Sequence, residues 1–254
     1  MSGRLVVVGL GPGDARLVTP EAQVALNAAD ALYGYGPYLD RVPPRSGQTR
    51  HASDNREEGA RAAAALRHAA EGASVAVVSG GDPGVFAMAA AVCEAIETGP
   101  AAWRALDVAV VPGVTAMLAV AARVGAPLGH DFCALSLSDN LKPWEVVERR
   151  LDAAASAGFV IALYNPVSRA RPWQLRAAFE RLRRQLPAST PVVFGRAVAR
   201  ADESVTVTTL KAADAEPADM ATLVIVGSPE TRVIARPDGP PLVYTPRAAH
   251  SVDP

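Results

Sequence analysis

Short valine-rich runs alternate with helix-length segments through the first half of the chain. Residues 4–8, 74–78 and 107–111 are each continuously apolar after a polar first residue, a pattern typical of strands buried on both faces of a parallel sheet. A helix is predicted to begin at Thr19-Pro20-Glu21, which offers a hydroxyl N-cap, a proline at the first helical position and an acid in the first turn. A second helix is predicted over 85–97, and a third over about 54–71, capped by Asp54 or Asn55. The pattern predicts an α/β fold whose first sheet is mainly parallel.

The second half of the chain has a different order of predicted strands and helices. Strands are predicted at 132–137, 159–164, 192–197, 204–209 and 222–226, and helices at 144–158 and 172–186. The last three strands have little room for helices between them, which predicts a partly antiparallel, mixed sheet. We therefore expect an N-terminal α/β domain over 1–115, a C-terminal α/β domain over 116–247, and a disordered tail over 248–254.

Glycine-rich turns follow two of the predicted parallel strands. Ser79-Gly80-Gly81-Asp82-Pro83-Gly84-Val85-Phe86 follows the strand at 74–78, and Pro112-Gly113-Val114-Thr115-Ala116 follows the strand at 107–111. Open α/β sheets bind ligands at the carboxyl ends of their strands, and glycines let the backbone approach a ligand closely. Asp82 is either a ligand-binding carboxylate or the N-cap of the next helix.

A third turn, Gly9-Leu10-Gly11-Pro12-Gly13-Asp14, suggests a dinucleotide-binding loop. The third glycine of that fingerprint, however, falls on Asp14, and Pro12 lacks the amide that a pyrophosphate would need. A nicotinamide-dependent oxidoreductase stays open as an alternative, with Asp30 near the distance of the ribose-binding acid. So does a ligand-binding module without catalytic activity.

Composition and residue spacing indicate which kinds of partner and cofactor to expect. The chain is 50% hydrophobic and 20% charged with a net charge of -1, which gives no electrostatic reason to expect nucleic acid or an anionic membrane as partner. Cys93 and Cys133 form no Cys-x-x-Cys pair, the four histidines have no metal-ligand spacing, and no apolar run reaches membrane-spanning length. We expect a cytoplasmic protein without a metal. The sequence contains no catalytic triad signature or P-loop, so a bound cofactor is expected to supply the reactivity.

The three glycine turns, together with Tyr164-Asn165-Pro166, resemble in order and spacing the tetrapyrrole methylases. The segments 35–38, 53–58 and 129–139 are most similar to the members that act on precorrin-3B. The resemblance covers residues 3 to about 247. It implies two α/β domains, S-adenosylmethionine in the cleft between them, and a homodimer. The implied reaction is methylation of precorrin-3B at C-17 with ring contraction to precorrin-4, in aerobic cobalamin biosynthesis. A cobalt-containing substrate or another ring carbon stays open.

The resemblance also implies roles for individual residues, and the ring and carboxylates of a precorrin add others. The cofactor-binding positions are Gly80, Gly81, Asp82, Val85, Thr115, Ala116, Tyr164, Ala197, Thr222 and Leu223. The substrate-binding candidates are Pro12, Tyr35, Tyr38, Arg56 and Asp139. Aromatic faces and positive charge suit a flat, carboxylate-rich ring, which favours Tyr35, Tyr38 and Arg56. The resemblance implies that the loop of Pro12 faces the tetrapyrrole, and Asp139 lies in a loop outside the cofactor motifs. The candidates for proton transfer during ring contraction are Asp14, His130 and Ser79, with Asp139 also open.

Overall fold

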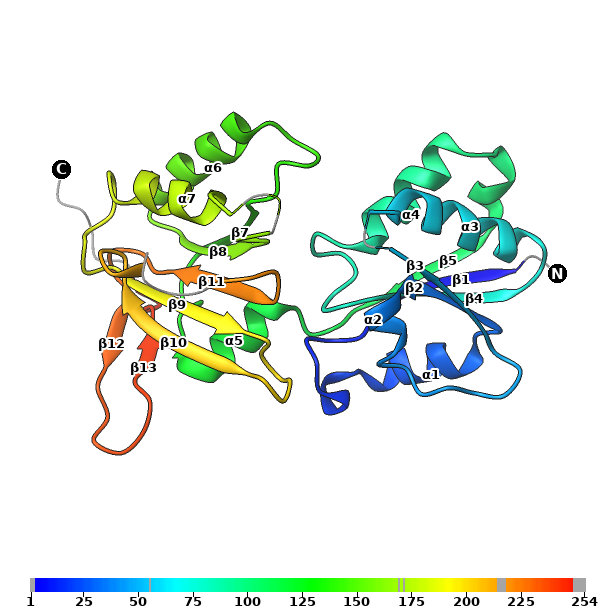
Figure 1. The fold of residues 1–254 in the computed structure, drawn as a ribbon, viewed down its shortest axis with the longest axis horizontal. Coiled ribbons are helices and arrows are strands. Elements are labelled where there is room, and N and C mark those ends of the chain that lie inside the picture. Colours follow the sequence, from blue (N-terminus) through cyan, green and yellow to red (C-terminus); the bar gives the residue numbers. More distant parts are fainter. Residues whose placement is uncertain (1–2, 55, 169, 171, 214–217, 249–254) are drawn as a thin grey trace. The chain divides into compact units, whose positions relative to one another are not determined.

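A computed structural model describes residues 3–54, 56–168, 170, 172–213 and 218–248 (Figure 1). The chain divides into two compact units, Met1–Ala116 and Met117–Pro254, here called the N-terminal unit and the C-terminal unit. Within the described ranges, no helix is both long enough and apolar enough to cross a membrane.

The N-terminal unit is built on one five-stranded sheet in the order β3-β2-β4-β1-β5. Every neighbouring pair is parallel, as the valine-rich runs predict. The strands are β1 (Arg4–Gly9), β2 (Ala31–Tyr35), β3 (Thr49–Ser53), β4 (Ser74–Ser79) and β5 (Asp107–Val111). Because β1 lies between β4 and β5, the loops that follow these three strands leave the same edge of the sheet.

Helices cover both faces of this sheet. They are α1 (Pro20–Ala28), α2 (Gly36–Leu39), α3 (Glu58–Ala70) and α4 (Met88–Thr98), with 3-10 turns η1 (Ala15–Leu17) and η2 (Ala101–Ala105). Leu5 and Val7 pack with α3 and α4, whereas Val6 and Val8 pack with α1 and α2. Successive strand residues point to opposite faces, and both faces are covered. This explains why β1 is continuously apolar instead of alternating.

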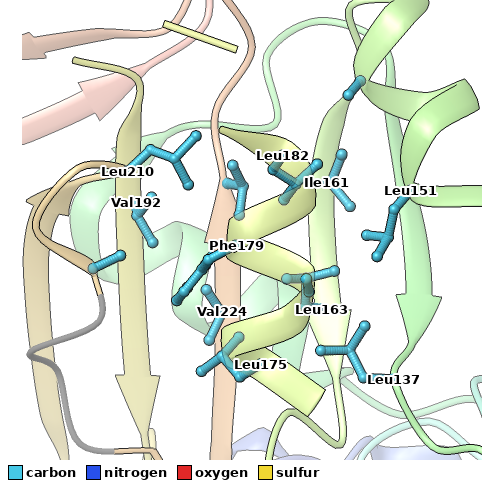
Figure 2. Close-up of a cluster of buried hydrophobic side chains, with 14 of the residues drawn as sticks. Leu137, Leu151, Ile161, Leu163, Leu175, Phe179, Leu182, Val192, Leu210 and Val224 are labelled. Atoms are coloured by element: carbon cyan, nitrogen blue, oxygen red, sulfur yellow. The ribbon is translucent and has the colours of Figure 1, made fainter. Parts of the chain in front are cut away.

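The C-terminal unit contains a second five-stranded sheet in the order β10-β9-β11-β8-β7. The strands are β7 (Phe132–Ser136), β8 (Val160–Tyr164), β9 (Pro191–Arg196), β10 (Ser204–Thr209) and β11 (Thr222–Val226). Only the β7–β8 pair is parallel among the pairings of this sheet, so the predicted mixed sheet is confirmed. The helices α6 (Trp144–Ser156) and α7 (Gln174–Leu182) cover one face, and their core with the sheet includes Phe179, Leu151 and Ile161 (Figure 2).

The opposite face of this second sheet is covered by α5 (Ala116–Val124). Phe194 of β9 belongs to the core under α6 and α7, so its neighbour Gly195 points the other way. A Cβ on Gly195 would collide with the side chain of Val120, which places α5 directly against β9. A small third sheet of β6 (Gly125–Ala126), β12 (Arg232–Ile234) and β13 (Leu242–Tyr244) completes the unit, in the order β12-β13-β6.

Two helix starts differ from the predictions. Helix α3 begins at Glu58 with Glu57 at its N-cap and no side-chain cap, so the predicted cap by Asp54 is wrong; Asn55 lies outside the described residues. Helix α4 begins at Met88 instead of 85, because Phe86 adopts φ +51, which no α-helix contains. The strands β3, β6 and β12 are not predicted. Of the predicted tail, residues 249–254 lie outside the described part of the chain.

Candidate cofactor and substrate site

Three glycine turns meet at the carboxyl edge of the N-terminal sheet. The turns after β1 and β4 are joined by reciprocal backbone hydrogen bonds: Gly11 N donates to Gly81 O at 3.1 Å, and Gly81 N donates to Gly11 O at 2.9 Å. Leu10 N donates to Ser79 O at 2.9 Å. The turns that the sequence singles out separately are therefore one structural feature, here called the glycine knot: residues 9–13, 79–84 and 112–115.

Close backbone approach explains why glycine occupies these positions. A Cβ on Gly9 would lie 2.8 Å from Gly81 O, and a Cβ on Gly113 would lie 3.0 Å from Gly9 Cα, so neither position has room for a side chain. Gly81 has φ +66, which glycine adopts without strain. In contrast, a Cβ on Gly81 would meet nothing nearer than Thr115 Cα at 3.8 Å. Of these three glycines, Gly81 alone has room for a methyl-sized group, which would make ordinary van der Waals contact with the start of α5.

Asp82 ties two of the turns together. Its Oδ1 accepts from Gly84 N at 2.8 Å, and its Oδ2 accepts from Gly113 N at 3.0 Å. The N-cap of α4 is Ala87, so the interpretation of Asp82 as a helix cap is wrong. Instead its carboxylate links the turn after β4 to the turn after β5.

Other candidate side chains surround the knot. Ser79 and Thr115 are buried, and Val85 is half-buried. The ring of Tyr38 packs on Gly80, where an added Cβ would lie 2.6 Å from Cζ, and Tyr35 meets Tyr38 edge-to-face with centroids 5.4 Å apart. The structure therefore brings both tyrosines to the edge that carries the predicted cofactor positions.

The first turn is stabilised by an arginine that the sequence analysis misses. The guanidinium of Arg41 donates from Nη2 to Leu10 O at 2.5 Å and to Gly11 O at 3.0 Å. Nothing in the pattern around Arg41 indicates this role, since arginine supplies nearly all the basic residues of the chain.

Asp14 follows the same turn and has a clear local role. It caps η1, and its carboxylate binds both Arg16 N at 2.8 Å and the Arg16 guanidinium at 2.6 Å. Pro12 is buried in this turn. Arg56 is exposed and lies just before α3.

In the C-terminal unit, Tyr164 lies at the carboxyl end of β8. Its hydroxyl accepts a hydrogen bond from Met117 N at 3.1 Å, which ties β8 to the first turn of α5. The next residue, Asn165, has φ +51 and donates to Ser136 Oγ at 2.9 Å. Ser136 pairs with Tyr164 in the β7–β8 register, so this polar group lies where two parallel strands end.

Lys142 joins this polar group and is also missed by the sequence analysis. Its ammonium donates to Ser138 O at 3.0 Å, and burial, followed by repulsion from Arg150, lowers its pKa. Asp139, in the same loop, accepts from Gln174 Nε2 at 2.9 Å. That Lys142 is one of only two lysines is the signal that could have drawn attention to it.

Ala197, Thr222 and Leu223 lie together where β9 ends and β11 begins. Ala197 N donates to Ala221 O at 3.0 Å, and Leu223 pairs with Gly195. The hydroxyl of Thr222 donates to Asp219 Oδ1 at 2.9 Å and accepts from Asp219 N at 3.0 Å. Both hydrogen-bonding functions of this hydroxyl are thus engaged by the protein.

The carboxylate of Asp219 accepts several hydrogen bonds at this strand end, and these lower its pKa. Burial raises its pKa, but hydrogen bonds from Thr222, from Arg196 and from Ala221 N outweigh that effect, so the net pKa lies below the ordinary value of an aspartate. The Arg196 Nε to Asp219 Oδ2 distance is 2.8 Å.

His130 lies away from the other C-terminal candidates. It precedes β7, whereas Asp139 and Tyr164 follow the carboxyl ends of the parallel strands β7 and β8. A five-residue strand separates the two ends by roughly 17 Å. The Nδ1 atom of His130 accepts from Asp131 N at 2.7 Å, which leaves Nε2 to carry the proton of the neutral ring. Among the described residues, no group of three or more His, Cys, Asp or Glu side chains is arranged to hold a metal ion.

The fold and the knot define a class: a two-unit α/β protein that offers glycine-lined backbone at the carboxyl edge of a parallel sheet. The family model described as Tetrapyrrole (Corrin/Porphyrin) Methylases matches residues 4–214. The chain belongs to this family.

Relatives and solved structures refine the comparison. The chain is 66% identical over 247 residues to a precorrin-3B C(17)-methyltransferase from Sinorhizobium sp, and the match covers 97% of both proteins. It is 43% identical to a probable cobalt-factor III C(17)-methyltransferase from Salmonella typhimurium, over 96% of this chain and 98% of that protein. A crystal structure of the methyltransferase CobJ superposes with a TM-score of 0.90 at 50% identity, covering 96% of this chain and all of that one.

Proposed function

We propose that this protein transfers the methyl group of S-adenosylmethionine to C-17 of precorrin-3B, with ring contraction to precorrin-4. The observation that carries the proposal is the end-to-end similarity to the Sinorhizobium relative, at 66% identity over 97% of each protein. The glycine knot supports it, because this reaction needs a cofactor held by backbone groups and few titratable side chains.

The residues present fit such a cofactor. In the N-terminal unit, we assign Gly80, Gly81, Asp82, Val85, Thr115 and Ala116 to the methionine and ribose portions, because a Cβ on Gly81 would reach Thr115 and Ala116 at 3.8 and 4.0 Å and the backbone of these turns offers N–H and C=O groups. In the C-terminal unit, we assign Tyr164, Ala197, Thr222 and Leu223 to the adenine side. Because the Thr222 hydroxyl is already engaged, Thr222 would contact the base through its backbone or its methyl group.

When bound, S-adenosylmethionine supplies an electrophilic methyl group. The task of this chain is then to align the tetrapyrrole carbon with that methyl group and to exclude water. Tyr35 and Tyr38 are placed to present aromatic surface beside the knot. Pro12 is buried in the first turn, and we propose that it acts on the substrate through the position of that turn. We propose that Arg56 and Asp139 contact polar groups at the rim of the ring.

Ring contraction requires a proton to move. Ser79, Asp14 and His130 differ in their burial, in their hydrogen-bond partners and in their position in the fold. Ser79 is buried at the carboxyl end of β4, within the knot. Asp14 is beside the knot but its carboxylate is bound to Arg16. His130 has Nε2 available for proton transfer but precedes β7 instead of following it. Because Ser79 and Asp14 lie at the edge that carries the glycine turns, we place them ahead of His130 as proton-transfer candidates.

The proposal is tested by incubating the protein with labelled S-adenosylmethionine and either precorrin-3B or cobalt-factor III, and then measuring label incorporation and product mass. We expect the label to be transferred to precorrin-3B, which gives a ring-contracted product that carries both the label and an acetyl group. Preferential turnover of cobalt-factor III would favour the alternative that the Salmonella relative suggests. Binding of NADH without binding of S-adenosylmethionine would refute methyl transfer altogether.

We further propose that the protein acts as a homodimer in the cytoplasm. Cys93 and Cys133 are both free thiols, which suits a reducing compartment. Light scattering after size-exclusion chromatography measures the mass in solution, and a monomer would contradict the proposed dimer.

A further inference from the structure

The turn that follows β9 holds two alanines in the left-handed region. Ala197 has φ +48 and Ala199 has φ +65. This conformation is unfavourable for any residue with a Cβ, and elsewhere the chain mostly places glycine where φ is positive. Strained backbone persists only where surrounding contacts determine it, and such strain clusters at functional sites.

Glu203 supplies the contact that determines this turn. Its Oε2 accepts from Ala199 N at 2.6 Å. Its carboxylate is also bound by the guanidinium of Arg123, with Nε to Oε1 at 2.6 Å and Nη2 to Oε2 at 3.1 Å. The hydrogen bond from Arg123, more than any other contact, lowers the pKa of Glu203. The carboxylate is therefore ionised at neutral pH and joins the strained turn to α5.

Helix α5 makes three contacts with the strands and turns of the C-terminal unit. Met117 N binds the Tyr164 hydroxyl at the end of β8, Val120 packs against Gly195 of β9, and Arg123 binds Glu203. The first and last of these contacts reach Tyr164 and the Ala197 turn, two of the positions assigned above to the adenine side.

We infer that Glu203 is a positioning residue for cofactor binding: it holds the turn at 197–199 in its left-handed conformation and fixes that turn to α5 through Arg123. The inference rests on the proposed function, because it assumes that Ala197 contacts the adenine of S-adenosylmethionine. Ala197 N and Ala197 O are already bonded to Ala221 O and Arg200 N. What the turn offers a base is therefore the Ala197 methyl group and the second lone pair of its carbonyl oxygen, and both depend on the turn's conformation.

The test is cofactor affinity, measured by calorimetry with S-adenosylhomocysteine on wild type and Glu203→Ala. We expect Kd to rise about tenfold, and KM for S-adenosylmethionine to rise with it while kcat changes little, because the turn would act on binding and not on the methyl transfer step. The matched control is Asp152→Ala. Asp152 binds Arg181 with similar geometry, at 2.8 and 2.6 Å, but joins α6 to α7, which carry no proposed cofactor residue. The control should bind as wild type does.

A double variant separates positioning from general stability. Glycine adopts positive φ without strain, so Glu203→Ala combined with Ala199→Gly should recover part of the lost affinity. If Glu203→Ala does not fold, Arg123→Lys, which keeps the charge but loses the two-pronged contact, should weaken binding instead. Wild-type affinity in Glu203→Ala, equal loss in Asp152→Ala, or no recovery in the double variant would each overturn the inference. Failure of the wild type to bind S-adenosylhomocysteine would instead refute the proposed function.

Discussion

Asp82→Ala is the substitution for which the structure makes the sharpest prediction. The carboxylate accepts from Gly84 N and Gly113 N, and alanine leaves both N–H groups without this partner. Gly84 is exposed, so water can replace the carboxylate there. Gly113 is half-buried and packed against Gly9 and Gly81, so water cannot replace the carboxylate as readily at Gly113.

The magnitude follows from the Gly113 hydrogen bond. A hydrogen bond to a charged group contributes about 1.5–3 kcal/mol, so we expect Asp82→Ala to lower the free energy of unfolding by about 2 kcal/mol. For a chain of this length, that loss corresponds to a decrease in Tm of roughly 4–8 °C. Asp82→Asn keeps one acceptor oxygen for two N–H groups, and we expect an intermediate loss.

Calorimetry of the apo protein measures this effect, and a second scan with saturating S-adenosylhomocysteine measures the cofactor's contribution. Bound ligand should raise Tm in the wild type, and by less in Asp82→Ala, because the turns that would bind the ligand are no longer tied together. The control is Asp107→Ala, which removes an exposed carboxylate paired with Arg4 at 3.2 Å at the amino end of β5. An exposed pair of this kind contributes about 0–1 kcal/mol.

If the Tm of Asp82→Ala equals that of Asp107→Ala, the link between the turns contributes nothing measurable to stability, and the reasoning is refuted. If stability falls as expected but the shift caused by the ligand is unchanged, Asp82 supports the fold and not the cofactor.

Two further predictions concern the knot and the β9–β11 strand end. Gly113→Ala would force a Cβ against Gly9 and Gly81, and we expect a loss of about 1–3 kcal/mol of stability in urea unfolding together with weaker cofactor binding; unchanged unfolding would show that the turns can separate without cost. Asp219 has a pKa below its ordinary value, so its contribution to stability is present at neutral pH and is lost as the pH falls through that lowered pKa. Asp219→Asn should therefore have a lower Tm than the wild type at pH ~7, and the difference should shrink below about pH 4; a constant difference across this range would contradict the assignment.

Several features of the fold could be predicted from local sequence because local forces produce them. The helix start at Thr19 is confirmed: its hydroxyl accepts from Ala22 N at 3.1 Å. The parallel and mixed sheets were also predictable, since the valine-rich runs require burial on both faces and the short connections after 192–197 leave no room for crossover helices. The glycine turns lie together at one edge of the sheet because strand order places β4, β1 and β5 side by side, and that this edge binds a ligand stays a prediction.

What local sequence could not determine depends on contacts between distant residues. The edge strand β3 is polar and mostly exposed, so no apolar pattern marks it; its pairing with β2 defines it. Asp82 matches the expectation of a helix cap locally, and only the approach of Gly113, 31 residues away, determines what its carboxylate binds. The pair of Arg123 and Glu203 is separated by 80 residues, so no local pattern could have joined them. The sequence by itself determined the buried strands, most of the helices and the glycine turns, because local propensity and burial define them. The tertiary structure decided which of these segments meet and where the polar edge strands form, because both depend on long-range packing and hydrogen bonding.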